Sequence, residues 1–165
     1  MVGRVTFRSK TKPVLTVECW LGAERAQVTG GYGGWEIVER PRKTGVTQWN
    51  GRQPYTMSVP ILIDGFSERE EVESDCFTLE QMALPWGKEP PVIKIISNAV
   101  PHTDLDWVVA NIEWGEAISG KFNGKRIRQE ATVVFLRYNA ADKLQLTAAA
   151  HARNKKKGDT LFRIR

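Results

Sequence analysis

Alternation of apolar and polar residues at every second position is the feature that most constrains how this chain folds. From Leu15 to Leu21 the odd positions are apolar, while Thr16 and Glu18 between them are polar. Residues 55–63 repeat the pattern, with apolar side chains at the odd positions. A period of two places successive side chains on opposite faces of a strand. The sequence therefore predicts β-strands with one buried face.

Three further segments are predicted as strands, at residues 92–96, 107–114 and 127–138. The first follows a Pro90-Pro91 stop, and the last two are joined by a turn that contains Asn123-Gly124. Asn-Gly is a strong hairpin signal because both residues tolerate a positive φ. Proline cannot donate a hydrogen bond to a neighbouring strand, so Pro60 predicts that the 55–63 strand lies at a sheet edge or bends there.

One segment has the period of a helix. Val72, Cys76, Leu79 and Ala83 fall at i, i+4, i+7 and i+11, on a single helical face. Acidic residues dominate the first turns, where the helix dipole favours them, and Pro85 predicts the end. The predicted class is α+β and β-rich: an antiparallel sandwich or split barrel with one short amphipathic helix and a flexible basic C-terminal arm.

The net charge of +5 is unevenly distributed along the chain. Residues 143–165 contain seven basic side chains and one acidic one, whereas residues 1–142 contain 17 basic and 18 acidic side chains. We therefore predict a nearly neutral β-rich domain over 1–142, followed by a basic linker or arm over 143–165. A folded nucleic-acid reader carries its basic residues on one face, so a nucleic-acid partner is not favoured.

The basic cluster itself consists of Lys155, Lys156 and Lys157 beside Arg153. A short block of like charge at a terminus is usually solvated, and it often serves as an interaction arm. Binding to nucleic-acid phosphates through this arm is the less favoured interpretation, because no reading element accompanies the cluster.

The sequence predicts no catalytic, cofactor or metal site, and therefore no enzyme. The Gly-rich segment 30–34 is followed by an alternating stretch that ends at Pro41, whereas a phosphate-binding loop needs a helix directly after it. His102, Asp104 and Asp106 are predicted as a polar interstrand loop, because too few metal-ligand types stand near them.

Two other features bear on the class of protein. Cys19 and Cys76 are far apart in sequence and are predicted as buried, reduced thiols. No apolar run is long enough to span a membrane, and the N-terminus lacks the apolar core of a signal peptide. We therefore expect neither a membrane partner nor secretion.

Six tryptophans are many for a chain of 165 residues. Trp107 or Trp114 is expected to fill the small β core. Trp35, Trp49 and Trp86 lie next to turn-forming glycines and prolines, so these three are predicted to contact a partner. Tryptophan suits that role because it buries a large area at a low entropic cost.

The order of several motifs along the chain is more specific than any single motif. The strand 54–63 with its Asp64-Gly65-Phe66 turn comes first and is followed by the acidic helix. The Pro90-Pro91 strand and a closing hairpin with Gly124-x-Arg126-x-Arg128 come after the helix. This order resembles the tube/baseplate adaptor proteins of phage tails and contractile injection systems. The resemblance covers residues 30–138.

The C-terminal residues 157–164 are similar to the opening of a LysM module, which commonly reads G-D-T-L-x-x-I. A lone strand and turn cannot bury a core, so this piece is not expected to fold alone. The piece is instead predicted either to dock on a neighbour as an added strand, with Leu161 and Phe162 as contact residues, or to be a disordered relic.

The resemblance implies a structural virion protein at the distal end of a phage tail, assembled in the host cytoplasm. Its partners would be other tail proteins of the tube, hub and baseplate or tip, with copies of the chain in a homo-oligomeric ring. The alternative is a cell-wall glycan-binding module derived from LysM.

Overall fold

The computed structural model describes residues 3–65, 72–120 and 124–139. Strands dominate it, and a single α-helix occurs in these ranges, which confirms the predicted β-rich α+β class. The elements are β1 (Arg4–Ser9), β2 (Thr16–Leu21), β3 (Gln27–Thr29), β4 (Trp35–Arg40), β5 (Lys43–Trp49), β6 (Thr56–Asp64), α1 (Val72–Ala83), β7 (Ile93–Ile96), β8 (Trp107–Ser119) and β9 (Arg126–Arg137).

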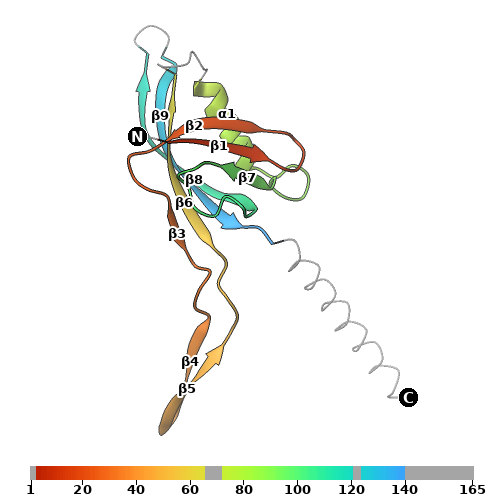
Figure 1. Ribbon diagram of the computed structural model, residues 1–165, viewed down its shortest axis with the longest axis vertical. Helices are drawn as coiled ribbons and strands as arrows, with labels where there is room; N and C mark the ends of the chain where they lie inside the picture. The colour runs from red at the N-terminus through yellow and green to blue at the C-terminus, as the bar shows by residue number, and fades with distance from the viewer. Residues whose placement is uncertain (1–2, 66–71, 121–123, 140–165) are drawn as a thin grey trace, which may run out of the picture.

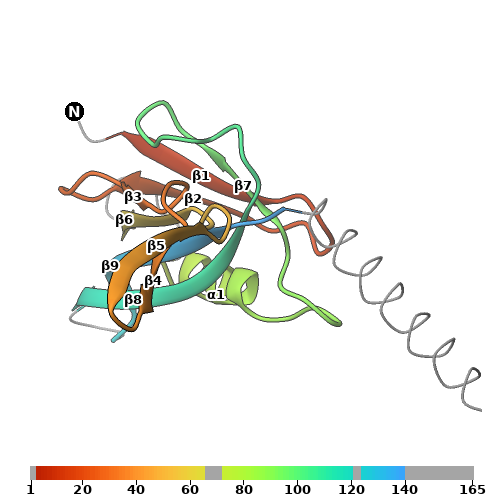
Figure 2. The ribbon, with the colours of Figure 1, turned by 90° about the horizontal axis from the view of Figure 1, so that it is seen from below.

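Six strands close into an antiparallel barrel in the order β1-β2-β6-β9-β8-β7 (Figures 1 and 2). Two of its seams are short: β7 meets β8 only at Ile93 and Trp107, and β2 meets β6 only at Trp20–Leu62 and Leu21–Ile61. The long seams are β6–β9 and β8–β9. The structure therefore resolves the predicted sandwich or split barrel as a barrel with two weakly paired seams.

Pro60 predicts that β6 lies at a sheet edge or bends there, and the first of these alternatives is wrong. β6 pairs along its whole length with β9, and its other side pairs with β3 and then with β2. Pro60 sits at the change of partner, where its carbonyl accepts a hydrogen bond from the Gly22 N–H at 2.9 Å. Because the N–H and C=O of one strand residue point to the same side, the N–H that proline lacks would face this interruption.

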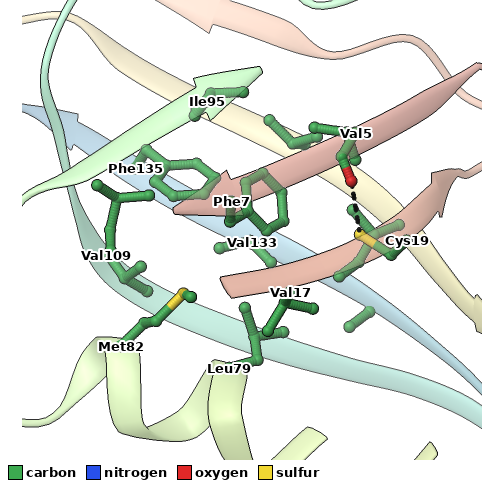
Figure 3. Packing of buried hydrophobic residues seen from close by; sticks show 14 of the residues in the cluster. Val5, Phe7, Val17, Cys19, Leu79, Met82, Ile95, Val109, Val133 and Phe135 are labelled. Atoms are coloured by element: carbon green, nitrogen blue, oxygen red, sulfur yellow. Dashed lines mark hydrogen bonds between the residues drawn. The ribbon is translucent and has the colours of Figure 1, made fainter. Parts of the chain in front are cut away.

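The core fills the barrel, as the alternating pattern predicts. Phe7 of β1 and Phe135 of β9 meet at the centre with ring centroids 5.1 Å apart, and Val133 lies beside them (Figure 3). Trp107 is fully buried and donates its indole N–H to the His102 carbonyl at 3.1 Å. Of the two tryptophans that the sequence offers for the core, Trp107 is therefore in the core.

Helix α1 covers one end of the barrel and packs against β2, β6, β8 and β9 (Figure 2). Its buried residues are Val72, Cys76, Leu79 and Met82. Met82 takes the fully buried place that the sequence pattern assigned to Ala83, which is only partly buried. The helix ends at Ala83, two residues before Pro85, as predicted.

An ion pair fixes the start of α1 to the start of β9. The Arg126 guanidinium donates to Oε1 of Glu73 at 2.9 Å and to Oε2 at 2.6 Å, and the Arg126 backbone N–H also donates to Oε1, at 3.1 Å. These hydrogen bonds lower the pKa of Glu73 from 4.5 to about 2. The same contacts raise the pKa of Arg126.

Both cysteines are free and buried, as predicted. The Cys19 thiol donates to the Val5 carbonyl at 3.7 Å (Figure 3). Burial raises the pKa of Cys19, and Asp75 and Glu18 add to that shift. Burial likewise raises the pKa of Cys76 to about 11. Neither thiol is therefore a nucleophile at neutral pH.

Two hairpins extend the molecule along its longest axis. The outer part of the β8–β9 hairpin lies at one end, and the β4–β5 hairpin lies at the other (Figure 1).

Asn123 and the proposed boundary at residue 142 lie outside the described residues, although Gly120 and Gly124 on the two sides of the turn are joined by a 3.2 Å backbone hydrogen bond. Within the described ranges, no helix is long and apolar enough to cross a membrane.

Candidate functional site

Residues 35–49 form a two-stranded sheet that stands away from the barrel, and we call it the β4–β5 arm (Figure 1). Its strands pair antiparallel with each other and pack mainly against each other. None of its side chains is buried in the core. A lone two-stranded hairpin is only marginally stable in water, so an arm of this kind gains stability by contacting a partner.

One face of the arm is apolar. Trp35 pairs with Trp49 and Ile37 with Thr47, so these four side chains share a face. The two indole rings meet edge to face, with centroids 5.1 Å apart and an interplanar angle of 61°. Trp35 is nevertheless 66% exposed, Trp49 47% and Ile37 70%. A cluster of large apolar side chains left in solvent is typical of an interaction site.

The opposite face and the tip of the arm are more polar. Val38 and Val46 pair on this face, next to Glu36 and Gln48, and the Glu36 carboxylate accepts a 2.6 Å hydrogen bond from the side chain of Asn50. At the tip, Arg40, Arg42 and Lys43 lie on both sides of the turn. They make no ion pair with any described residue. The arm therefore combines an apolar shaft with a positively charged end.

Glycines join the arm to the barrel. The Gly-rich segment 30–34 leads from β3 into β4, and residues 50–55 lead back from β5 into β6. Gly34 has φ +91°, and a Cβ at this position would lie 1.6 Å from the Gly51 carbonyl oxygen. No other residue fits so close to the returning chain. The interpretation of this segment as a turn that feeds a strand is confirmed, because β4 follows it.

Tyr55 anchors the base of the arm. Its ring meets Tyr32 edge to face at 6.5 Å, stacks on His102 at 5.1 Å, and carries the Arg137 guanidinium at 5.7 Å. Its carbonyl accepts the Arg137 N–H at 2.9 Å. The direction in which the arm leaves the barrel is therefore set by a packed aromatic group and by the glycines.

Only two of the three tryptophans predicted at an interface come together. Trp35 and Trp49 form the apolar face of the arm, whereas Trp86 lies in the loop between α1 and β7. Trp86 is 48% exposed, and its indole N–H donates to the Gln81 carbonyl at 3.0 Å. Whether Trp35, Trp49 and Trp86 bind a partner stays a prediction.

Residues 102–106 lie in the loop between β7 and β8, as the sequence predicts, and three of them make structural contacts. Asp106 accepts two hydrogen bonds from the Lys10 ammonium, at 2.9 and 2.8 Å. The Asp104 carbonyl accepts one from Lys94 at 2.6 Å, and His102 stacks on Tyr55. Across the described part of the chain, no three His, Cys, Asp or Glu side chains gather as metal ligands do.

The other predicted contact residues, Lys155, Lys156, Lys157, Leu161 and Phe162, lie outside the described residues. The LysM-like segment and the basic cluster therefore stay predictions. Sequence reasoning missed Ile37, Val38 and Val46, which share the arm with the two tryptophans. The alternation of residues 36–40 was the available signal, but nothing in it showed that neither face of that strand would be buried.

No protein-family model matches the chain, and no curated protein matches it significantly in sequence.

Proposed function

We propose that this chain is a structural, non-enzymatic component of a bacteriophage tail that joins the tube or hub to baseplate or tip proteins. It would be assembled in the host cytoplasm and act in the virion, in several copies around the tail axis. The observation that carries the proposal is the β4–β5 arm. A chain with its own closed core gains nothing in solution from holding Trp35 and Trp49 outside that core.

The order of motifs that resembles tail adaptors also supports the proposal, because each motif marks one part of a single barrel. Asp64 ends β6, and the Gly65 N–H that follows donates to the Ile127 carbonyl at 3.0 Å. Helix α1 then covers the barrel, Pro90-Pro91 precede β7, and β8–β9 is the closing hairpin. In this chain the motifs that carry the resemblance therefore belong to one connected barrel.

The character of the polar residues fits an assembly role better than catalysis. His102, Asp104 and Asp106 hold loops together, and both thiols are buried. A protein that works by assembly needs only a stable body and an exposed contact surface. The barrel and the arm supply these two parts.

Affinity purification tests the proposal. A tagged chain is expressed in cells that produce the particles, and co-purifying proteins are identified by mass spectrometry. We expect tube, hub and baseplate or tip proteins with the wild type, and their loss with the double variant Trp35→Ala, Trp49→Ala. Phe77→Ala is the matched control, because it removes an aromatic side chain that is 60% exposed on α1, outside the arm.

The opposite result is equally specific. If the chain sediments with peptidoglycan but enriches no tail protein, the tail proposal is wrong and the glycan-binding alternative is favoured. Loss of enrichment in the Phe77→Ala variant alone would show that the arm is not the contact surface.

A further inference from the structure

The outer surface of the barrel has a groove that none of the described elements fills. It has a volume of about 490 Å³ and crosses β6, β9 and β8 beside the β2–β3 loop. We call it the β6–β9 groove. Its lining residues include Ala23, Glu24, Pro60, Leu62, Glu113 and Glu130.

The β6–β9 groove is lined mainly by apolar and acidic residues. Pro60 and Leu62 lie on the outer face of β6, because the odd residues of that strand are buried in the core. Glu24 and Glu113 are exposed and make no ion pair with described residues. Glu130 is 3.6 Å from the Arg128 guanidinium, which is the basic side chain among the lining residues.

The β4–β5 arm has the complementary character. Its shaft presents Trp35, Ile37 and Trp49, and its tip presents Arg40, Arg42 and Lys43, which form no ion pair within the described part of the chain. Apolar side chains fit the apolar lining residues of the groove, and the cations of the tip fit the carboxylates of Glu24, Glu113 and Glu130. The two surfaces therefore match both in polarity and in sign of charge.

The arm does not fill the groove of its own chain. It leaves the barrel before Thr56, at the start of β6, and runs away from the part of β6 that holds Pro60 and Leu62 (Figure 1). Strands of this length extend about 20 Å, so the tip lies far from its own groove. A second copy of the chain can supply the arm.

We propose that the β4–β5 arm of one copy docks in the β6–β9 groove of the next copy. The two surfaces are different patches of one molecule, so the contact is heterologous and each docked copy still offers a free arm and a free groove. Such contacts repeat until they close into a ring or continue as a filament. This inference rests on the proposed function, for which it supplies the contact between copies.

Exchange of charges tests the contact. One variant carries Arg40→Glu, Arg42→Glu and Lys43→Glu, and a second carries Glu24→Arg, Glu113→Arg and Glu130→Arg. In each variant the arm and the groove have the same sign of charge, so we expect self-association to weaken by about tenfold or more. A mixture of the two variants restores opposite signs at every contact and is expected to associate like the wild type. Sedimentation velocity over a concentration series measures all three samples.

Site-specific crosslinking gives a second measurement that does not depend on charge. A chain with Arg42→Cys is mixed with a chain with Glu113→Cys under mild oxidation, and we expect a disulfide-linked dimer. The control mixes Arg42→Cys with Arg8→Cys, which places an exposed thiol on β1. The native thiols do not interfere because both are buried.

The inference is overturned if the wild type stays monomeric at every concentration, if the charge variants associate as the wild type does, or if the Arg8 position crosslinks as fast as Glu113. These outcomes leave the proposed function open to its own test, since the chain can still enrich tail proteins. Conversely, arm-to-groove crosslinks from a chain that enriches no tail protein would support the contact and contradict the tail function.

Discussion

Trp35 and Trp49 face each other across the β4–β5 hairpin, with their ring centroids 5.1 Å apart and both side chains exposed to solvent. Two such side chains buried in the barrel would stabilise the core. On a separate hairpin, the two side chains stabilise the shape of the arm and still leave about half or more of their surface exposed to a partner.

Replacing Trp35 and Trp49 with alanine is expected to loosen the arm and leave the barrel intact. Loss of the cross-strand aromatic pair costs the hairpin about 1 kcal/mol, and none of the side chains of the hairpin is buried in the barrel core to offset that loss. Thermal unfolding followed by circular dichroism should give an unchanged midpoint, while amide hydrogen exchange over residues 35–49 accelerates. A large fall in the midpoint would contradict the separation of arm and barrel.

Gly34→Ala is expected to displace the arm, because the new Cβ would collide with the Gly51 carbonyl oxygen. Gly33→Ala is the matched control: Gly33 also has a positive φ (+83°), but its Cβ would meet nothing within 4 Å. Both variants carry the backbone cost of about 1–2 kcal/mol for a side chain at positive φ. NMR shifts of the Trp35 and Trp49 indoles should change much more in Gly34→Ala, and equal changes would contradict the steric role of Gly34.

Phe135→Ala is expected to destabilise the barrel by about 3–5 kcal/mol, because it removes a fully buried ring that packs on Phe7. Leu136→Ala is the control on the next residue of the same strand, where the side chain is 39% exposed on the outer face. Urea unfolding measures both variants. Similar losses of stability at the two positions would contradict the assignment of the inner and outer faces of β9.

The Glu73–Arg126 contact makes part of the stability depend on pH. The pKa of Glu73 falls from 4.5 to about 2 in the folded protein, so its contribution is complete above about pH 5 and disappears as the pH falls toward 2. Glu73→Gln should therefore lower the free energy of unfolding at pH 7 and match the wild type near pH 2. Glu80→Gln, on the exposed face of α1, is the control. A Glu73→Gln deficit that persists unchanged at pH 2 would contradict this role.

Local sequence patterns predicted much of the fold, because strand faces and helix faces leave periodic signals. The inward residues of β6 and β9 and the single helix follow directly from those periods. β1 carried the same alternation at Val5 and Phe7 but was not recognised. Barrel closure was not predictable in this way, because the β1–β7 and β2–β6 pairings join segments far apart in the chain.

The position of β6 shows where local reasoning fails. Pro60 does indicate a missing hydrogen bond. The strand accommodates this proline because β6 changes its partner from β3 to β2 at that point, and not because β6 lies at an edge. The candidate site was predictable only in part. Neighbouring glycines indicated Trp35 and Trp49 as contact residues. The arm stands apart because residues 35–49 do not pack against the barrel, and no pattern within residues 35–49 encodes that lack of packing.

Electron cryo-microscopy of the purified phage tail tests the central claim most directly. The account predicts several copies of the barrel around the axis at the distal end, with Trp35 and Trp49 of each arm buried against a neighbouring subunit. A tail that contains no copy of this chain would contradict the proposed function. A tail in which the chain is present but its arms stand free in solvent would contradict the role of the β4–β5 arm.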